Sequence, residues 1–124
     1  MRDQYQLDVQ RFGFKKSERL LKSEEFLQVR RKGKRYSTKS FIIHIIPSGI
    51  EVSRLGLSVG AVVGNAVKRN RFKRLLREFF RTHKHLFARP LDIVMSVKKG
   101  ADIRAYKDVE AELAPLWLRA GKGR

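Results

Sequence analysis

The spacing of apolar residues in the first half of the chain predicts one helix followed by strands. Ser23 is a suitable N-cap for a helix whose first turn is acidic, and Gly33 is typical of the C′ position that ends a helix. An apolar, β-branched run over residues 41–46 predicts a strand. Apolar and polar residues then alternate within residues 52–63, which predicts a second extended stretch.

The second half of the chain predicts two helices separated by one strand. Helical spacing covers residues 66–82, and Asn65 is a suitable N-cap for that helix. Residues 91–97 form a short apolar strand, and a last helix is expected over about residues 103–119, where Pro115 should kink or shorten it. The predicted order is αβββαβα, when the extended stretch over residues 52–63 is counted as two strands, and this is an α+β fold in which helices pack against a small central sheet.

A length of 124 residues allows one domain with a modest core. We expect residues 14–119 to form it, residues 1–13 to be a flexible extension and residues 120–124 a flexible basic tail. No apolar run is long enough to span a bilayer and no leader-like segment opens the chain, so we expect no membrane partner and a cytoplasmic location. The absence of cysteine excludes disulfides, thiolate zinc sites and a cysteine nucleophile.

The charge balance indicates a domain that binds a polyanion. Lys and Arg number 29 against 12 Asp and Glu, a formal net charge of +17. Residues 11–39 hold eleven basic and three acidic residues, and residues 65–81 hold seven basic residues and one acidic residue. A compact body with two such basic blocks repels itself unless it meets an anionic partner, so nucleic acid is the expected partner.

The helix over residues 66–82 has two distinct faces. Its apolar residues fall within one arc of the helical wheel and should face the core: Phe72, Leu75, Leu76, Phe79 and Phe80. Its cations fall on the opposite side: Arg71, Lys73, Arg74, Arg77 and Arg81. Lys68, Arg69 and Arg71 also crowd the helix N-terminus, where the helix dipole disfavours positive charge, and this pattern predicts a phosphate-binding surface.

The run from Gly64 to Leu75, with the sequence GNAVKRNRFKRL, resembles the signature of the bacterial ribonuclease P protein component. Three further matches flank it: Phe26-x-x-Val29-x-x-x-Gly33, the run from Arg54 to Val59, and Asp92-Ile93-Val94. The resemblance covers roughly residues 14–119. It implies a fold like the second domain of ribosomal protein S5, with a left-handed strand–helix–strand crossover in place of the usual right-handed one.

The resemblance implies an accessory subunit of an RNA-catalysed endoribonuclease, ribonuclease P, which removes the 5′ leader from precursor tRNA. The cofactors that the resemblance implies are the catalytic RNA and Mg²⁺, which is bound mainly by that RNA. The implied partners are the catalytic RNA and precursor tRNA. One protein is expected to bind each RNA, and the free protein is expected to be a monomer. Residues expected to bind the catalytic RNA are Asn65, Lys68, Arg69, Asn70, Arg71, Lys73, Arg74 and Arg77. Residues expected to bind the leader are Phe26, Arg30, Ile42 and His44.

The leader surface also follows from the strand pattern. Ile42 and His44 share one face of the strand over 41–46, and we expect this face to be open while the opposite face packs on the core. Phe26 could instead belong to the core. Relatives often carry an aromatic residue where this chain has Arg30, and lysines where it has Ala61 and Val62.

Other classes of function fit the sequence less well. His83 and His85 are two residues apart and do not face each other on a helix, and the acidic residues show no catalytic spacing, so we expect no catalytic residues in the protein itself. A helix-turn-helix DNA-binding protein would need a short helix and a tight turn before the basic helix, whereas an extended stretch precedes that helix here. A ribosomal or other structural RNA-binding protein remains the alternative.

Overall fold

The computed structural model describes residues 15–120 and gives the predicted order αβββαβα. The additional strand lies at residues 34–37, however, and residues 52–63 hold one strand rather than two. The predicted extension over residues 1–13 and residues 121–124 of the predicted tail lie outside the described residues. The elements are α2 (Ser23–Lys32), β1 (Lys34–Ser37), β2 (Phe41–Pro47), β3 (Arg54–Ser58), α3 (Ala66–His83), β4 (Leu91–Val97) and α4 (Tyr106–Ala120). Three short 3₁₀ turns join them: η1 (Lys16–Glu18), η2 (Ala61–Val63) and η3 (Lys84–Leu86).

The four strands form one mixed sheet in the order β1-β2-β4-β3. β2 pairs antiparallel with both β1 and β4, whereas β3 and β4 are parallel neighbours joined through α3. Parallel neighbours need such a crossover connection, and this is the unit for which the resemblance predicts a left-handed path.

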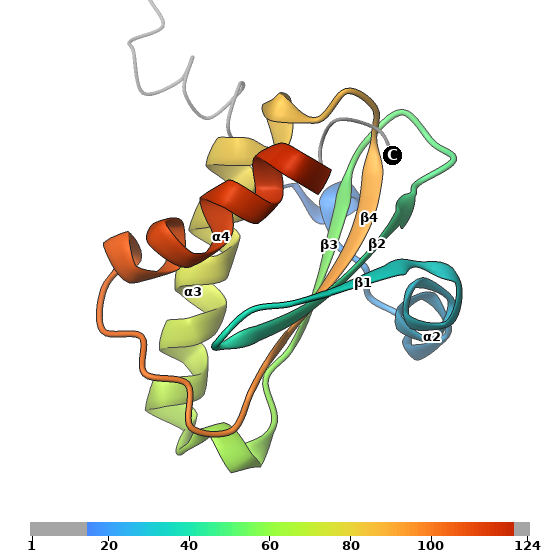
Figure 1. Cartoon of the computed structure of the whole chain (residues 1–124). Helices are drawn as coiled ribbons and strands as arrows, with labels where there is room; N and C mark the ends of the chain where they lie inside the picture. Colours follow the sequence, from blue (N-terminus) through green and yellow to red (C-terminus); the bar gives the residue numbers. More distant parts are fainter. Residues whose placement is uncertain (1–14, 121–124) are drawn as a thin grey trace, which may run out of the picture.

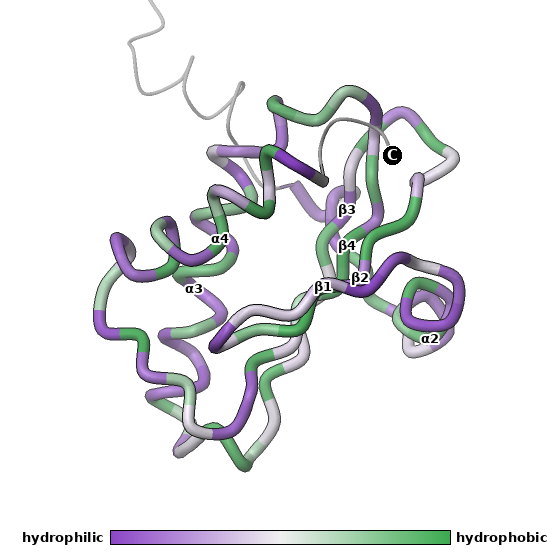
Figure 2. Tube along the Cα trace, viewed as in Figure 1, coloured by the Kyte–Doolittle hydropathy of each residue, from purple (hydrophilic) through white to green (hydrophobic). Residues whose placement is uncertain are grey.

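The helices cover the two faces of the sheet unequally. Figure 1 shows α3 and α4 on one face and α2 on the other. Hydrophobic segments are concentrated on the strands, while both helices of the larger layer alternate between hydrophobic and hydrophilic positions (Figure 2). This arrangement gives a larger core under α3 and α4 and a smaller one under α2.

The larger core confirms the predicted inner face of α3. All five apolar residues of that face are buried: Phe72, Leu75, Leu76, Phe79 and Phe80. They pack against alternating residues of the strands, including Phe41, Ile43 and Ile45 as predicted. Trp117 of α4 closes this layer, with its ring edge-on to Phe79 at a centroid distance of 4.9 Å and its indole N–H donating to the carbonyl of His83.

The smaller core fixes α2 on the opposite face. Leu20, Val29 and Val94 are buried there, and Phe26 and Ile46 pack against them. The Phe26 ring lies so close to Gly56 of β3 that a Cβ at this position would be 2.7 Å from it. Gly56 is therefore required by close packing. Phe26 is partly a core residue, which was the alternative to a role in leader binding.

At both ends of the first helix, the residue or the conformation that ends the helix differs from the prediction. Lys22, not Ser23, is the N-cap residue, because the Glu25 carboxylate accepts the N–H groups of Leu21 and Lys22 and satisfies the start of the helix. Gly33 ends the helix with φ −79°, so it is not in the left-handed conformation. Its role is steric, since a Cβ there would lie 2.4 Å from the carbonyl oxygen of Val29.

Two other boundaries differ from the prediction. The extended stretch stops at Ser58, and Ala61–Val63 form a 3₁₀ turn closed by hydrogen bonds from the amides of Val63 and Gly64. α4 begins at Tyr106 rather than 103, because the Asp108 carboxylate accepts the amides of residues 104 and 105 ahead of it. Pro115 does not shorten α4, because the buried residues Leu116 and Trp117 hold the turn beyond it against the core.

Candidate nucleic-acid interface

The N-terminus of α3 is a tightly built turn. As predicted, Asn65 is its N-cap, with the side-chain oxygen accepting the backbone N–H of Lys68 at 2.9 Å. Gly64 precedes it with φ +152°, and the Arg69 side chain donates to the Gly64 carbonyl at 3.2 Å. These hydrogen bonds fix the Lys68 backbone and the Arg69 side chain at the helix entrance.

Four cations of α3 form what we call the α3 cationic surface: Lys68, Lys73, Arg74 and Arg77. Arg74 and Arg77 are exposed, and Lys68 and Lys73 are half-buried. Within residues 15–120, none of the four has an ion pair or side-chain hydrogen bond. Arg81 differs, because Glu78 accepts two hydrogen bonds from it, each 2.8 Å long. The unpaired cations are therefore concentrated in the first three turns of the helix.

Arg71 is oriented differently from the other cations of the helix. Its guanidinium donates to the main-chain carbonyl of Ile103 at 2.7 Å, which ties α3 to the loop before α4. Its Nε is buried and has no hydrogen-bond partner among the described residues. The helical wheel placed Arg71 on the solvent side, but the loop over residues 98–105 crosses that side and takes the guanidinium as an anchor.

The four predicted leader-binding residues meet on the α2 face of the sheet. The Arg30 guanidinium lies 5.9 Å from the centre of the Phe26 ring, and its Nη2 donates to the Ser96 hydroxyl at 3.4 Å. Ser96 lies on β4 and is the register partner of Ile42 on β2. His44 follows Ile42 by two residues and lies on the same face of β2. Both Ile42 and His44 are half-buried, so this face is partly covered by α2 and partly open.

His44 is a neutral hydrogen-bonding group within this surface. Burial lowers the pKa of its imidazole, and the nearby cations Arg30 and Arg35 lower that pKa further. Its Nδ1 atom is buried and has no partner in the described part of the chain. An uncharged imidazole carries one N–H donor and one acceptor, so at neutral pH it offers hydrogen bonds rather than charge.

A cleft of about 170 Å³ joins the two surfaces at the β3 edge of the sheet. Lys73 and Arg77 of α3 line one side and Phe26 of α2 the other. The remaining lining residues are Arg19, Leu20, Leu21, Leu55 and Leu57. The sequence assigned α2 and α3 to separate surfaces, and no sequence signal indicates that they share a cleft.

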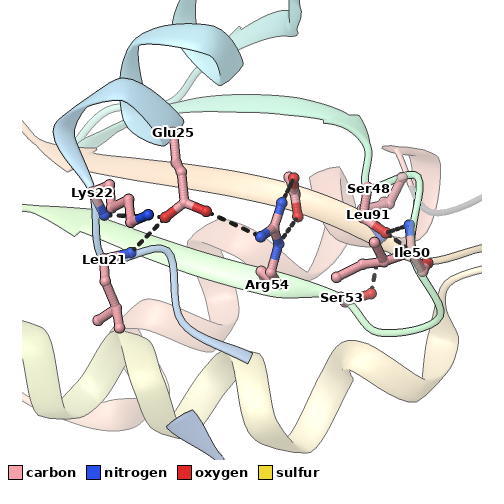
Figure 3. A network of polar contacts seen from close by, with 9 residues as sticks. Leu21, Lys22, Glu25, Ser48, Ile50, Ser53, Arg54 and Leu91 are labelled. Carbon is pink, nitrogen blue, oxygen red and sulfur yellow. Dashed lines mark hydrogen bonds and ion pairs between the residues drawn. The ribbon is translucent and has the colours of Figure 1, made fainter. Parts of the chain in front are cut away.

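A polar network that the sequence analysis missed holds α2 in place (Figure 3). Arg54 of β3 donates two hydrogen bonds to the Asp92 carboxylate, at 2.9 and 2.7 Å, and one to Glu25 at 3.1 Å. Glu25 in turn caps α2, and these backbone N–H donors, followed by Arg54, hold the pKa of its carboxyl below its usual value. The entrance of α2 is thereby fixed to β3 and β4.

The polar contacts of His83 belong to the packing between helices. His83 stacks on Phe79 at a centroid distance of 4.0 Å and lies 3.7 Å from Glu110, so it belongs to the packing of α3 on α4. Among residues 15–120, no group of three or more histidine or carboxylate side chains is arranged to hold a metal ion. In the same range, no helix has the length and apolarity needed to cross a membrane.

Comparison with known proteins agrees with this geometry. Residues 14–121 match the family model described as Ribonuclease P. The ribonuclease P protein component of Syntrophus aciditrophicus is 44% identical over 108 residues, covering 87% of this chain and 91% of that protein. The counterpart from Dictyoglomus thermophilum is 43% identical over 113 residues, covering 89% of this chain and 93% of that protein.

Solved structures show the same fold. The RNase P protein of Staphylococcus aureus superposes with a TM-score of 0.75 at 30% identity, covering 86% of this chain and 97% of that one. The Thermotoga maritima RNase P protein gives a TM-score of 0.70 at 31% identity, covering 82% and 96%. The basic helix, the mixed sheet and these similarities together show that the chain belongs to the ribonuclease P protein family.

Proposed function

We propose that this protein subunit of ribonuclease P binds the ribonuclease P RNA through phosphates on the α3 cationic surface. The observation that supports this most is the set of four cations without a protein partner in the described residues, opposite a fully buried apolar stripe. Asn65 and Arg69 fix the helix entrance through their hydrogen bonds, and the exposed Asn70 follows them on the helix, where free N–H groups also favour phosphate. Arg71 contributes by holding the adjoining loop.

The catalytic chemistry belongs to the RNA in this proposal. Mg²⁺ prefers oxygen ligands and commonly binds phosphate oxygens, which the RNA supplies in quantity. The protein neutralises part of the RNA charge and presents the substrate. One protein per RNA is the expected stoichiometry, and the net charge of +17 disfavours self-association of the free chain.

The precursor tRNA leader is assigned to the α2 face of the sheet. A single strand is held by cations that track its backbone and by flat or apolar groups against its bases. Phe26 and Ile42 supply apolar surface, while His44 supplies hydrogen bonds. Arg30 can stack and carry charge, whereas an aromatic residue could only stack.

Removing the Arg30 and His44 side chains tests this assignment. The variant R30A/H44A, assembled with the ribonuclease P RNA, is expected to bind precursor tRNA about tenfold more weakly, because it can neither stack on the leader through Arg30 nor hydrogen-bond to it through His44. Binding of mature tRNA, which lacks the leader, should stay within about twofold. The affinities are measured by filter binding or fluorescence titration of the assembled enzyme.

The control variant is R31A, which removes a cation from the same helix on a neighbouring, exposed position. It should leave both affinities nearly unchanged. Equal losses for precursor and mature tRNA, or no loss for either, would place the leader elsewhere.

A further inference from the structure

We propose that Val62 and Val67 form an apolar contact with an unstacked base or a ribose of the ribonuclease P RNA. This inference rests on the proposed function and adds to it a contact that does not depend on charge. Val62 is 68% exposed and Val67 is 78% exposed, more than any other large apolar side chain in the described part of the chain. Both flank the Gly64-Asn65 entrance of α3, which adjoins the α3 cationic surface.

The two valines are held outward by a fixed backbone. Val63, between them, is 5% exposed and anchors the η2 turn in the main core. The amides of Val63 and Gly64 donate to the carbonyls of Gly60 and Ala61, and Asn65 caps the helix that carries Val67. Because the turn is hydrogen-bonded and anchored, the exposed valines are a preorganised surface, and binding through them orders little additional chain.

The surrounding charge selects the partner. We call Val62, Val67 and the η2 turn the valine tip. Residues 52–77 contain seven Lys and Arg and no Asp or Glu, so an anionic partner is favoured around this tip. A second copy of a chain with net charge +17 would be repelled from it. RNA combines phosphates with apolar base faces and riboses, and its unpaired bases are the parts that proteins contact with apolar side chains. The tip therefore fits an RNA segment whose phosphates lie on the neighbouring cations.

The experiment replaces both valines with threonine, which keeps the branched shape and exchanges one methyl for a hydroxyl on each side chain. The full-length V62T/V67T variant should bind the ribonuclease P RNA about 15-fold more weakly, because each substitution removes one methyl group from the apolar contact. The slope of log affinity against log salt should be unchanged, because every cation that meets a phosphate is retained. Affinity is measured by titration of the RNA at several salt concentrations.

The control is I50T/V52T, which makes the same kind of change at two exposed residues of the β2–β3 loop, at the other end of the sheet from η2 (Figure 1). It should bind as the unchanged chain does. Unchanged affinity of V62T/V67T would overturn the inference, as would a weaker affinity accompanied by a shallower salt slope. Sedimentation that shows a dimer of the unchanged chain, dissociated by V62T/V67T, would assign the tip to a second copy and also overturn it. Failure of the unchanged chain to bind the RNA would instead contradict the proposed function.

Discussion

Replacing Arg74 and Arg77 with glutamine is expected to weaken binding of the ribonuclease P RNA by about 30-fold at moderate salt. Both side chains are exposed and have no protein partner in the described residues, so in the complex each is free to bind a phosphate. We take about 1 kcal/mol for each charge-assisted hydrogen bond after solvent screening. The slope of log affinity against log salt should become shallower by about two, one for each phosphate that is no longer neutralised. Titrations at several salt concentrations give both quantities.

The matched control is K107Q/R119Q, which removes the same number of positive charges, two, from exposed positions of α4. It should change the affinity by less than about threefold. Equal losses in the two variants would mean that net charge, not the α3 cationic surface, determines binding. Arg71 is not a suitable target for this test, because its substitution would also remove the hydrogen bond to Ile103.

The variant R54A is expected to lose about 3 kcal/mol of the free energy of unfolding. Asp92 is 6% exposed and receives two hydrogen bonds from Arg54, so truncation leaves a buried carboxylate without its cation. The Glu25 carboxylate is more exposed and keeps its two backbone donors, so its share of the loss is small. Urea unfolding followed by circular dichroism measures the difference.

R104A provides the comparison for an ion pair at the surface. The Arg104 and Asp102 side chains are 83% and 70% exposed, so this variant should lose less than about 1 kcal/mol. A loss for R54A as small as that for R104A would show that the Arg54 network does not anchor α2.

The elements with strong local signals were predictable from the sequence. α3 combines a clear helical period with a capping asparagine, and its five inward residues are buried as predicted. β4 has the predicted bounds because it is an interior apolar strand and is covered on both faces. By contrast, β1 has the polar sequence Lys-Arg-Tyr-Ser and is a strand only because its backbone pairs with β2.

The candidate site could be predicted only in part, because much of it depends on packing between distant segments. Periodicity identified the cations of α3, but it could not show that the Arg71 guanidinium donates to the carbonyl of Ile103 in the loop before α4. The face of β2 that carries Ile42 and His44 follows from strand alternation. The cleft between Phe26 and Lys73 depends on how two helices lie around the β3 edge, and one sequence holds no local signal for that.

Reconstitution shows whether this chain assists cleavage or performs it. Precursor tRNA is incubated with the purified chain alone, with the ribonuclease P RNA alone, and with both, over a range of Mg²⁺ concentrations. We expect no cleavage by the chain alone at any Mg²⁺ concentration. With both components, cleavage at the mature 5′ end should be faster, at low Mg²⁺, than with the RNA alone. Correct 5′ processing by an RNA-free preparation of the chain, or no effect of the chain on the RNA-catalysed rate, would contradict an accessory role of the protein.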